Sequence, residues 1–353
     1  MEKKLTHGGD WAGFKSEYGY EPLDFSANVS PLGVPESVVQ AITDSAREAD
    51  KYPDPLCRAL CAAIGTYEGV DPSYVVCGNG AADVIFRLAG AMRGKKALVT
   101  APTFSEYETA LSANDCVVER YALREENGFR AGDGFLRAIG PDTDLVFLCE
   151  PNNPTGVTSG KEFLLKALKA CEENGAVLVI DECFNEFIDD PGSLTMKQAL
   201  DATDHLVILK AFTKVFAMAG VRLGYMLCSN RGIAEAVRGQ GQPWAVSGLA
   251  QAAGIAALGE PEYVERLSEL VREERPFLEQ GLRDLGLTVI PGEANYLLFR
   301  GPSDLEEDLR EKGILIRNCS NYHGLGDGWF RTAVRTREDN ERLLAAVSES
   351  LEK

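Results

Sequence analysis

Residues 206–214 read Leu-Val-Ile-Leu-Lys-Ala-Phe-Thr-Lys, an apolar run that passes into small and hydroxyl-bearing residues and ends on Lys214. The apolar run is typical of a buried strand, so we expect Lys214 where a strand ends and a loop begins. There its amine can be held away from bulk water and near a cation such as Arg222, and both effects lower the pKa of a lysine. Such a lysine is a nucleophile for carbonyl groups. The alternative is a solvated surface lysine, so the interpretation depends on the rest of the chain.

Short apolar runs alternate with helical patterns on both sides of this stretch. The expected strands span 74–77, 96–100, 116–121, 145–149, 176–180, 206–210 and 222–228. This alternation predicts an α/β fold with a mostly parallel seven-stranded sheet covered on both faces. After about residue 239 comes a helical pattern at 249–285 with a break near Pro261, then four short strands and a helix at 340–351. That order predicts a smaller α+β C-terminal domain.

The chain therefore divides into three expected parts. Residues 1–30 are rich in Gly, Asp, Ser and aromatic residues and show little periodicity, so we expect an extended arm or loop over 1–34. The large α/β domain is expected over 35–240 and the small C-terminal domain over 241–353.

The composition suits a large core and argues against several classes of partner. The chain has 353 residues, 45% of them hydrophobic, and a formal net charge of −18, which disfavours nucleic acid and anionic membranes as partners. No stretch approaches the ~20 apolar residues of a membrane span. The N-terminus lacks the apolar run of a signal peptide, so we expect a cytoplasmic protein. The nine cysteines include no C-x-x-C pair, which favours reduced thiols over a metal site.

Three other segments place polar groups directly after predicted strands. Gly78-Asn79-Gly80-Ala81-Ala82-Asp83 allows a tight turn into a helix whose free N–H groups suit a phosphate. The proline-rich segment 150–156 presents the Asn153 amide, which suits a phenolate oxygen. The apolar strand at 177–180 ends on Asp181, whose burial is costly without a cationic partner. Taken singly, the first two are also explained as turns, and the third as a carboxylate that caps a helix or pairs with a basic residue.

Taken together, the four segments describe one ligand. The carboxyl ends of strands in an open α/β sheet meet at the edge where ligands bind. An aldehyde for Lys214, a phosphate for the glycine-rich turn, a phenolate for Asn153 and a pyridine nitrogen for Asp181 all occur in pyridoxal 5'-phosphate (PLP). We therefore expect PLP as the cofactor, with its protonated ring acting as an electron sink.

The motifs GNGAAD, PNNPTG, VIDE, FTK and VRLGY resemble those of fold-type I PLP-dependent enzymes, in the histidinol-phosphate aminotransferase-like branch, over nearly the whole chain. The resemblance implies the PLP-dependent transferase fold type I, with Lys214 carrying the cofactor as a Schiff base and Lys214 and Asp181 as catalytic residues. The cofactor-binding residues that it implies are Gly80, Ala81, Ala82, Phe104, Asn153, Asp181, Thr213, Lys214, Arg222 and Tyr52. Such enzymes are homodimers with shared sites, so Tyr52 would reach the cofactor phosphate of a neighbouring subunit.

Four local features resemble a narrower group, the L-threonine-O-3-phosphate decarboxylases of cobalamin biosynthesis. His7-Gly8-Gly9-Asp10 and segment 23–33 are similar to an arm that folds over the active site in that group, although Asp10 stands where Asn is frequent. Phe184 stands where aminotransferases usually have Tyr, and segments 242–247 and 314–322 are also similar. The substrate-binding residues implied are His7, Asn28, Asn153, Arg317, Arg331 and Arg335.

We therefore expect decarboxylation of a small phosphorylated amino acid, L-threonine O-3-phosphate, to (R)-1-amino-2-propanol O-2-phosphate. The bond held perpendicular to the cofactor ring is the one that breaks, so orientation through the phosphate would select loss of CO2. The alternative is histidinol-phosphate aminotransferase or a related class I/II aminotransferase, which would use the same Lys214, Asp181 and Asn153. Serine phosphate, which lacks one methyl group, is a further candidate substrate. A third hypothesis, a non-catalytic regulator with this fold, is disfavoured by the retention of Lys214.

Overall fold

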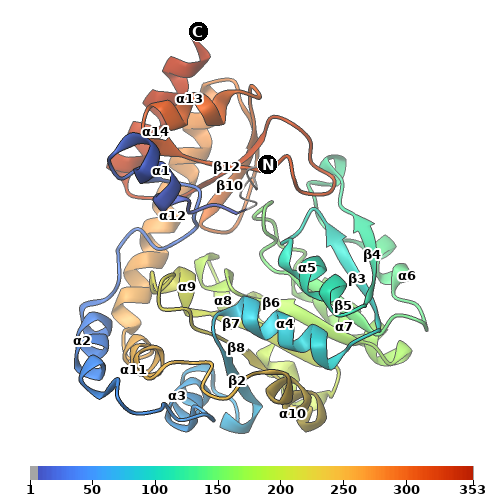
Figure 1. The fold of residues 1–353 in the computed structure, drawn as a ribbon. Coiled ribbons are helices and arrows are strands. Elements are labelled where there is room, and N and C mark those ends of the chain that lie inside the picture. The colour runs from blue at the N-terminus through green and yellow to red at the C-terminus, as the bar shows by residue number, and fades with distance from the viewer. Residues whose placement is uncertain (1–6, 353) are drawn as a thin grey trace.

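A seven-stranded sheet forms the centre of the computed structural model, which describes residues 7–352 (Figure 1). In spatial order its strands are β2 (Val75–Gly78), β8 (Gly224–Leu227), β7 (Leu206–Ala211), β6 (Val177–Asp181), β5 (Leu145–Cys149), β3 (Lys96–Ala101) and β4 (Val117–Ala122). All of them run parallel except β8, which is antiparallel to both of its neighbours. The prediction of a mostly parallel seven-stranded sheet is confirmed.

Helices cover both faces of this sheet because its central strands are apolar on both sides, and every residue of β5 and β6 is buried. One face packs against α4 (Ala81–Ala91), α5 (Glu106–Ala113) and α10 (Arg231–Gln240). The other packs against α2 (Glu36–Ser45), α3 (Arg58–Glu68), α6 (Asp133–Ala138), α7 (Lys161–Asn174), α8 (Pro191–Leu194), α9 (Phe212–Val215), α11 (Gly248–Ala257) and the first turns of α12 (Pro261–Asp284). Within residues 7–352, no helix has both the length and the apolar character that crossing a bilayer requires.

The C-terminal region forms a smaller α+β domain around a four-stranded antiparallel sheet. Its strands, in spatial order, are β12 (Arg317–Asn318), β13 (Trp329–Ala333), β10 (Tyr296–Arg300) and β9 (Thr288–Ile290). The later turns of α12 pack on this sheet together with α13 (Leu305–Glu311) and α14 (Arg337–Leu351). The long helix α12 therefore spans both parts of the molecule, as Figure 1 shows.

The N-terminal arm packs on the small domain. Strand β1 (Leu23–Asp24) pairs in parallel with β11 (Ile314–Leu315), and Phe25 is buried in the core of that domain. Helix α1 (Trp11–Tyr18) lies beside α13 (Figure 1), whose Arg310 stacks over Phe14 at 5.4 Å. The first six residues of the predicted arm lie outside the described residues.

The expectation of an extended arm or loop was wrong for Trp11–Tyr18, which is helical. Only Phe14 of that helix is buried, so no apolar period marks it in the sequence. Its start is fixed instead by Asp10, whose side chain accepts a hydrogen bond from the backbone amide of Gly13. The N-capping residue Asp10 was thus the signal in the sequence that could have predicted this helix.

Three further expectations can be compared with the structure. The break near Pro261 is confirmed, because α11 ends at Ala257 and Pro261 begins α12. The strand expected at 314–317 is divided between β11 and β12, which belong to different sheets. Lys214 lies in the one-turn helix α9 rather than in a loop.

The domain boundaries expected at residues 34 and 240 stay predictions. Helix α11, which follows residue 240, packs against α2 and α3 of the large domain.

A buried charge cluster lies behind β7. The amine of Lys210 is 2.7 Å from Glu186, 3.4 Å from Glu68 and 3.7 Å from Glu182. Burial by itself lowers the pKa of Lys210, but the three carboxylates outweigh that effect and hold this pKa well above its ordinary value. The cation is therefore retained inside the protein by three anions that share it.

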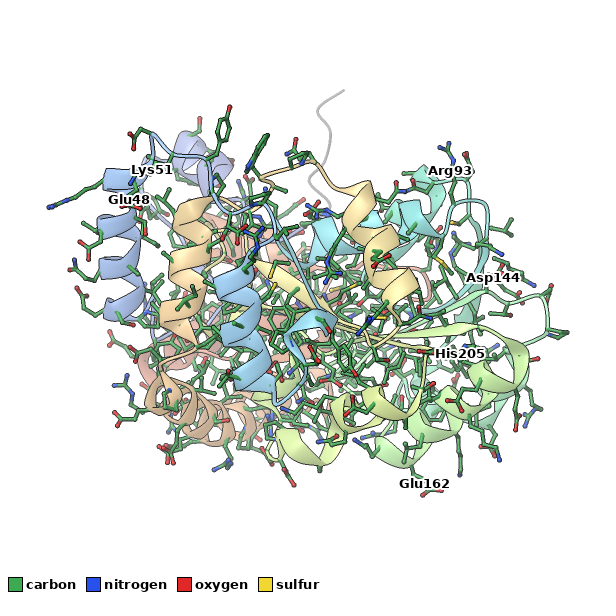
Figure 2. The ribbon with its side chains drawn as sticks, turned by 90° about the horizontal axis from the view of Figure 1, so that it is seen from below. Glu48, Lys51, Arg93, Asp144, Glu162 and His205 are labelled. Carbon is green, nitrogen blue, oxygen red and sulfur yellow. The ribbon has the colours of Figure 1, made fainter. Side chains whose placement is uncertain are left out.

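Replacing this lysine should destabilise the fold strongly. We expect Lys210→Met to lower the free energy of unfolding by about 3–5 kcal/mol, because Glu182 and Glu186 lose the cation they pair with and Glu68 is left with Lys197. Urea unfolding followed by circular dichroism measures the change. The matched control is Lys166→Met, which removes a lysine paired with Glu162 at 2.7 Å on the outer side of α7 (Figure 2). That change should stay within about 0.5 kcal/mol, and equal losses in the two variants would contradict our interpretation.

Candidate active site

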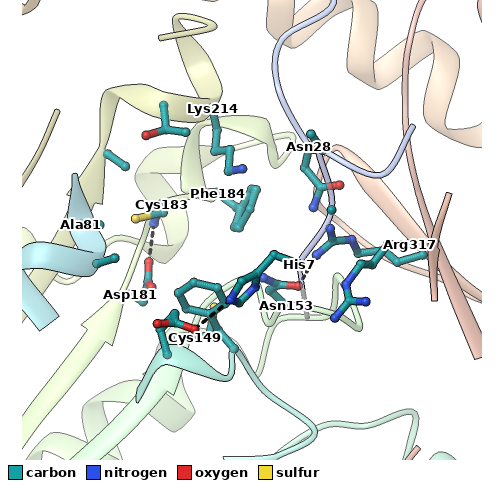
Figure 3. A pocket seen from close by; sticks show the side chains of 18 of the residues that line it. His7, Asn28, Ala81, Cys149, Asn153, Asp181, Cys183, Phe184, Lys214 and Arg317 are labelled. Carbon is teal, nitrogen blue, oxygen red and sulfur yellow. Dashed lines mark hydrogen bonds and ion pairs between the residues drawn. The ribbon is translucent and has the colours of Figure 1, made fainter. Parts of the chain in front are cut away.

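A pocket of about 440 Å³ opens at the carboxyl ends of β5, β6 and β7, facing the small domain (Figure 3). Cys149, Asp181 and Ala211, the last residues of these strands, all line it. The pocket brings together twelve of the residues singled out from the sequence, namely His7, Asn28, Ala81, Ala82, Phe104, Asn153, Asp181, Thr213, Lys214, Arg222, Arg317 and Arg331.

Lys214 projects into this pocket from α9 (Figure 3). Burial of its amine is the main cause that lowers its pKa from 10.5 to about 8, and the charges of Arg331 and Arg222 act in the same direction. The amine lies 6.0 Å from the centre of the Phe184 ring, which supplies an apolar wall. Lys214 therefore has the environment of a nucleophilic lysine, as the sequence predicted.

Asp181 is held at the end of β6 by neutral donors. The hydroxyl of Tyr107 donates to one carboxylate oxygen at 2.6 Å, and the backbone amide of Cys183 donates to the other at 2.9 Å. Within residues 7–352, no lysine, arginine or histidine forms an ion pair with this buried carboxylate. A buried carboxylate in such a setting suits a cationic ligand atom.

An anion cradle forms where β2 turns into α4. Gly80 precedes the helix with φ +88°, and a Cβ atom there would lie 2.6 Å from a terminal nitrogen of Arg222. Gly224 of β8 approaches the same turn so closely that its own Cβ would lie 2.3 Å from the amide of Ala81. No side chain of the described residues caps the first amides of α4, so this helix end and the Arg222 guanidinium together suit a phosphate.

Arg331 joins three segments at the far wall of the pocket. One terminal nitrogen donates to the side-chain oxygen of Asn153, and the other donates to the backbone oxygen of Ser26 at 2.9 Å. Its Nε is buried and has no hydrogen-bond partner among residues 7–352. The bond to Arg331 occupies the oxygen of Asn153 and leaves the amide nitrogen of that residue to donate to a ligand.

Arg317 and Asn28 complete the small-domain side. Arg317 is buried, lies over the ring of Tyr322 at 5.5 Å and donates to Asn321 at 2.8 Å. Asn28 lines the pocket, and its buried side-chain oxygen finds no hydrogen-bond partner in the part of the chain that the structure describes. Both residues therefore stand where the sequence placed them, on the wall opposite Lys214 (Figure 3).

Three predicted residues do not line the pocket of this chain. Gly80 lies behind the Arg222 guanidinium. The structure corrects the placement of Arg335, because its guanidinium pairs with Asp339 at 3.0 Å and donates to the backbone oxygen of Asp24 at 3.3 Å. It therefore ties the arm to α14 instead of facing a substrate. Tyr52 is 80% exposed on the outside of the molecule, and its role in a neighbouring subunit stays a prediction.

Comparison with known proteins identifies the family. Residues 20–347 match the model of the aminotransferase class I and II family. The chain belongs to this family. The threonine-phosphate decarboxylase of Salmonella typhimurium is 38% identical over 349 residues, which cover 97% of this chain and 95% of that protein. A histidinol-phosphate aminotransferase of Methanococcoides burtonii is 32% identical over 343 residues, covering 94% and 92%. The crystal structure of the histidinol-phosphate aminotransferase from Clostridium acetobutylicum has a TM-score of 0.88 at 30% identity, covering 94% and 99%.

Membership of the aminotransferase class I and II family makes this chain a PLP-dependent enzyme with the type I fold. The described residues fit that cofactor. Lys214 offers an amine of lowered pKa for the aldehyde, and Asp181 offers a carboxylate without a cationic partner for the pyridine nitrogen. The end of α4 and Arg222 offer amide and guanidinium donors for the phosphate. The predictions of family, fold and cofactor are thus confirmed.

Several residues of the site were not found from the sequence. Tyr107 supports Asp181, and Glu106 forms an ion pair with His7 at 2.9 Å, yet neither stands in a recognisable motif. Their only signal is that they follow Phe104 closely, on the helix that begins beside the pocket. The thiols of Cys149 and Cys183 also face this region, where burial raises the pKa of both. Their residue type suggested no more than core packing.

The lowered pKa of Lys214 leads to a test on the apoenzyme. Covalent capture of PLP requires the neutral amine, so its rate should rise with pH and level off above about 8. Stopped-flow absorbance measures the rate, and borohydride reduction followed by peptide mapping should place the label on Lys214. Lys214→Ala should carry no label there. A rate that kept rising to pH 10 would show that the amine has an ordinary pKa.

Proposed function

We propose that this enzyme is a threonine-phosphate decarboxylase, which releases CO2 from L-threonine O-3-phosphate and yields (R)-1-amino-2-propanol O-2-phosphate for cobalamin biosynthesis. The observation that carries the proposal is the 38% identity to the Salmonella decarboxylase over 97% of the chain. All nine cysteines are free thiols, which suits a reaction in the cytoplasm, where thiols stay reduced.

The charges of the pocket support a substrate with two separate anionic groups. Arg331 acts on the pKa of Lys214 and so lies close to the reacting centre. Its buried, unpartnered Nε is a free donor for the α-carboxylate. Arg317 lies on the same wall of the pocket, but its charge is not among the main causes that lower the pKa of Lys214. We therefore assign the carboxylate to Arg331 and the more remote phosphate to Arg317 and His7.

The reaction can be described by what each residue contributes. When bound, PLP would supply an electron sink for a substrate bond held perpendicular to its ring. Arg331 would hold the carboxylate in that orientation, and Asp181 would keep the pyridine nitrogen protonated. Lys214 would then return a proton to the carbon that CO2 has left. Phe184 has no hydroxyl to donate, so it contributes an apolar wall at the place where aminotransferases usually have Tyr.

Histidinol-phosphate aminotransferase is the second candidate, because a protein of that name is 32% identical over 94% of this chain. Lys214, Asp181 and Asn153 would serve either reaction. Decarboxylation and transamination differ in which substrate bond is held perpendicular to the cofactor ring. The side chains of the small domain that bind the remote phosphate set this orientation and so favour one of the two reactions.

Product analysis decides between the two reactions. With threonine phosphate we expect release of CO2 and formation of aminopropanol phosphate. With histidinol phosphate and 2-oxoglutarate we expect no glutamate. Arg331→Lys should lower kcat/KM for decarboxylation about 10- to 100-fold, because a lysine cannot form the paired bonds of a guanidinium to a carboxylate. Arg335→Lys is the matched control and should leave kcat/KM nearly unchanged. Glutamate without CO2 would replace the proposal with the second candidate.

We also propose that the enzyme works as a homodimer with shared sites. Tyr52 stacks on Trp244 with 4.5 Å between ring centres, and both rings are exposed, at 80% and 46%. Two exposed aromatic rings side by side are a feature of subunit interfaces. In such a dimer, Tyr52 would bind the cofactor phosphate of the partner subunit.

Mixing two defective variants tests the shared site. Tyr52→Ala should hold PLP weakly, and Lys214→Ala should be inactive, so each preparation alone has little activity. After mixing and subunit exchange, mixed dimers contain one intact site, and activity should approach about a quarter of the wild-type value. Tyr52→Phe, which keeps the ring and loses the hydroxyl, separates stacking from phosphate binding. No recovery in a mixture shown by native mass spectrometry to contain mixed dimers would refute sharing.

A further inference from the structure

A carboxylate lies in a pocket that otherwise suits anions. Among the described residues that line the pocket, Glu106 and Asp181 are the acidic ones, whereas Lys214, Arg222, Arg317 and Arg331 are basic. Asp181 faces the place expected for the pyridine nitrogen, so its charge has a partner in the proposed reaction. Glu106 has none there, and an uncompensated carboxylate would weaken the binding of a phosphate or carboxylate by like-charge repulsion. Its position therefore needs another explanation.

His7 lies against Glu106 and, as an imidazolium, would compensate its charge. The Nε2 atom of His7 lies 2.9 Å from a carboxylate oxygen of Glu106, and the dashed line in Figure 3 marks this pair. The His7 ring also contacts Phe104, with 6.4 Å between the ring centres. An imidazolium donates through both of its nitrogens, so Glu106 takes one donor and leaves Nδ1–H for a second acceptor.

The same pair connects the arm to the large domain. Within the arm, the start of the described chain is fixed to the segment before Asn28, because the amide of Gly9 donates to the hydroxyl of Ser26 at 2.8 Å. A Cβ atom at Gly8 would lie 2.3 Å from the backbone oxygen of Ser26, so only glycine fits there. That oxygen in turn accepts a hydrogen bond from Arg331. The arm is thus attached to the small domain through Ser26 and to α5 through His7.

We propose that Glu106 is a positioning residue: it holds the His7 imidazolium over the pocket, with Nδ1 left to donate to the phosphate of the substrate. The imidazolium of His7 in return cancels the charge of Glu106, so the pair allows an anion to bind. Without His7 the Glu106 carboxylate would repel the anion, and without Glu106 the His7 ring would lose its position. That this anion is the substrate phosphate rests on the proposed function. The contact between His7 and Glu106, and its effect on the binding of inorganic phosphate, do not rest on it.

A double-mutant cycle tests the coupling with inorganic phosphate as the probe. Binding to the PLP-loaded enzyme is followed by the shift of the visible cofactor band and by competition with threonine phosphate. His7→Ala should weaken phosphate binding about tenfold or more, because a donor is lost and Glu106 is left bare. In that background Glu106→Gln should tighten binding several-fold by removing the bare charge. In the wild-type background Glu106→Gln should not tighten binding, because His7 loses its anchor.

Tightening by Glu106→Gln in both backgrounds would overturn the proposal, since it would mean that the two residues act independently. A second readout needs no ligand: hydrogen exchange at the amides of Gly8 and Gly9 should become faster in Glu106→Gln. Unchanged exchange would also overturn it.

The matched control is Glu108→Gln, two residues further along α5. The Glu108 carboxylate pairs with Arg120 outside the pocket, so phosphate binding and arm exchange should both stay as in the wild type. If the cycle and the exchange behave as expected while threonine phosphate is not turned over, the role of Glu106 stands and the proposed function fails.

Discussion

Hydrogen bonds between parallel strands set the place of every reactive group. The register pairs Cys149 of β5 with Asp181 of β6, and Asp181 with Leu209 of β7, so all three strands reach the same edge. From that edge the loop after β5 carries Asn153, and helix α9 after β7 carries Lys214, into one pocket. Because side chains alternate between the faces of a sheet, a slip of one residue in β6 would turn Asp181 into the apolar layer beneath. The burial of both faces of the sheet is what makes such a slip costly.

Environment gives two lysines on one short stretch opposite properties. Lys210 and Lys214 are four residues apart, and both are removed from water, which by itself lowers the pKa of a lysine. Lys210 meets three carboxylates, and the outcome is a permanent cation that holds helices to the sheet. Lys214 meets the charges of Arg331 and Arg222, and the outcome is an amine that gives up its proton readily. The lysine that we expect to react is thus distinguished by its neighbours.

The strands and the cofactor motifs could be predicted because they are local patterns: apolar runs for the sheet, and glycines, prolines and polar residues at the strand ends. Contacts between distant segments could not. Glu106 meets His7 only because the arm folds back over α5, and Tyr107 reaches Asp181 across the helix–sheet interface. Arg335 was misplaced although Asp339, its partner one helical turn away, is visible in the sequence. The resemblance to known enzymes implied that Arg335 binds the substrate, whereas its ion pair with Asp339 determines where its side chain lies.

The pairing of β1 with β11 joins residues from opposite ends of the chain, with Leu23 beside Ile314. During synthesis on a ribosome, the arm emerges before the large domain, and its partner strand β11 exists only after that domain has been made. The large domain can fold meanwhile, and with it the lysine and the phosphate cradle. Arg317 and Arg331 arrive with the last segment, which also recruits Phe25 and the arm. A nascent chain would accordingly acquire the means to hold its cofactor well before it contained the arginines that we propose to bind the substrate.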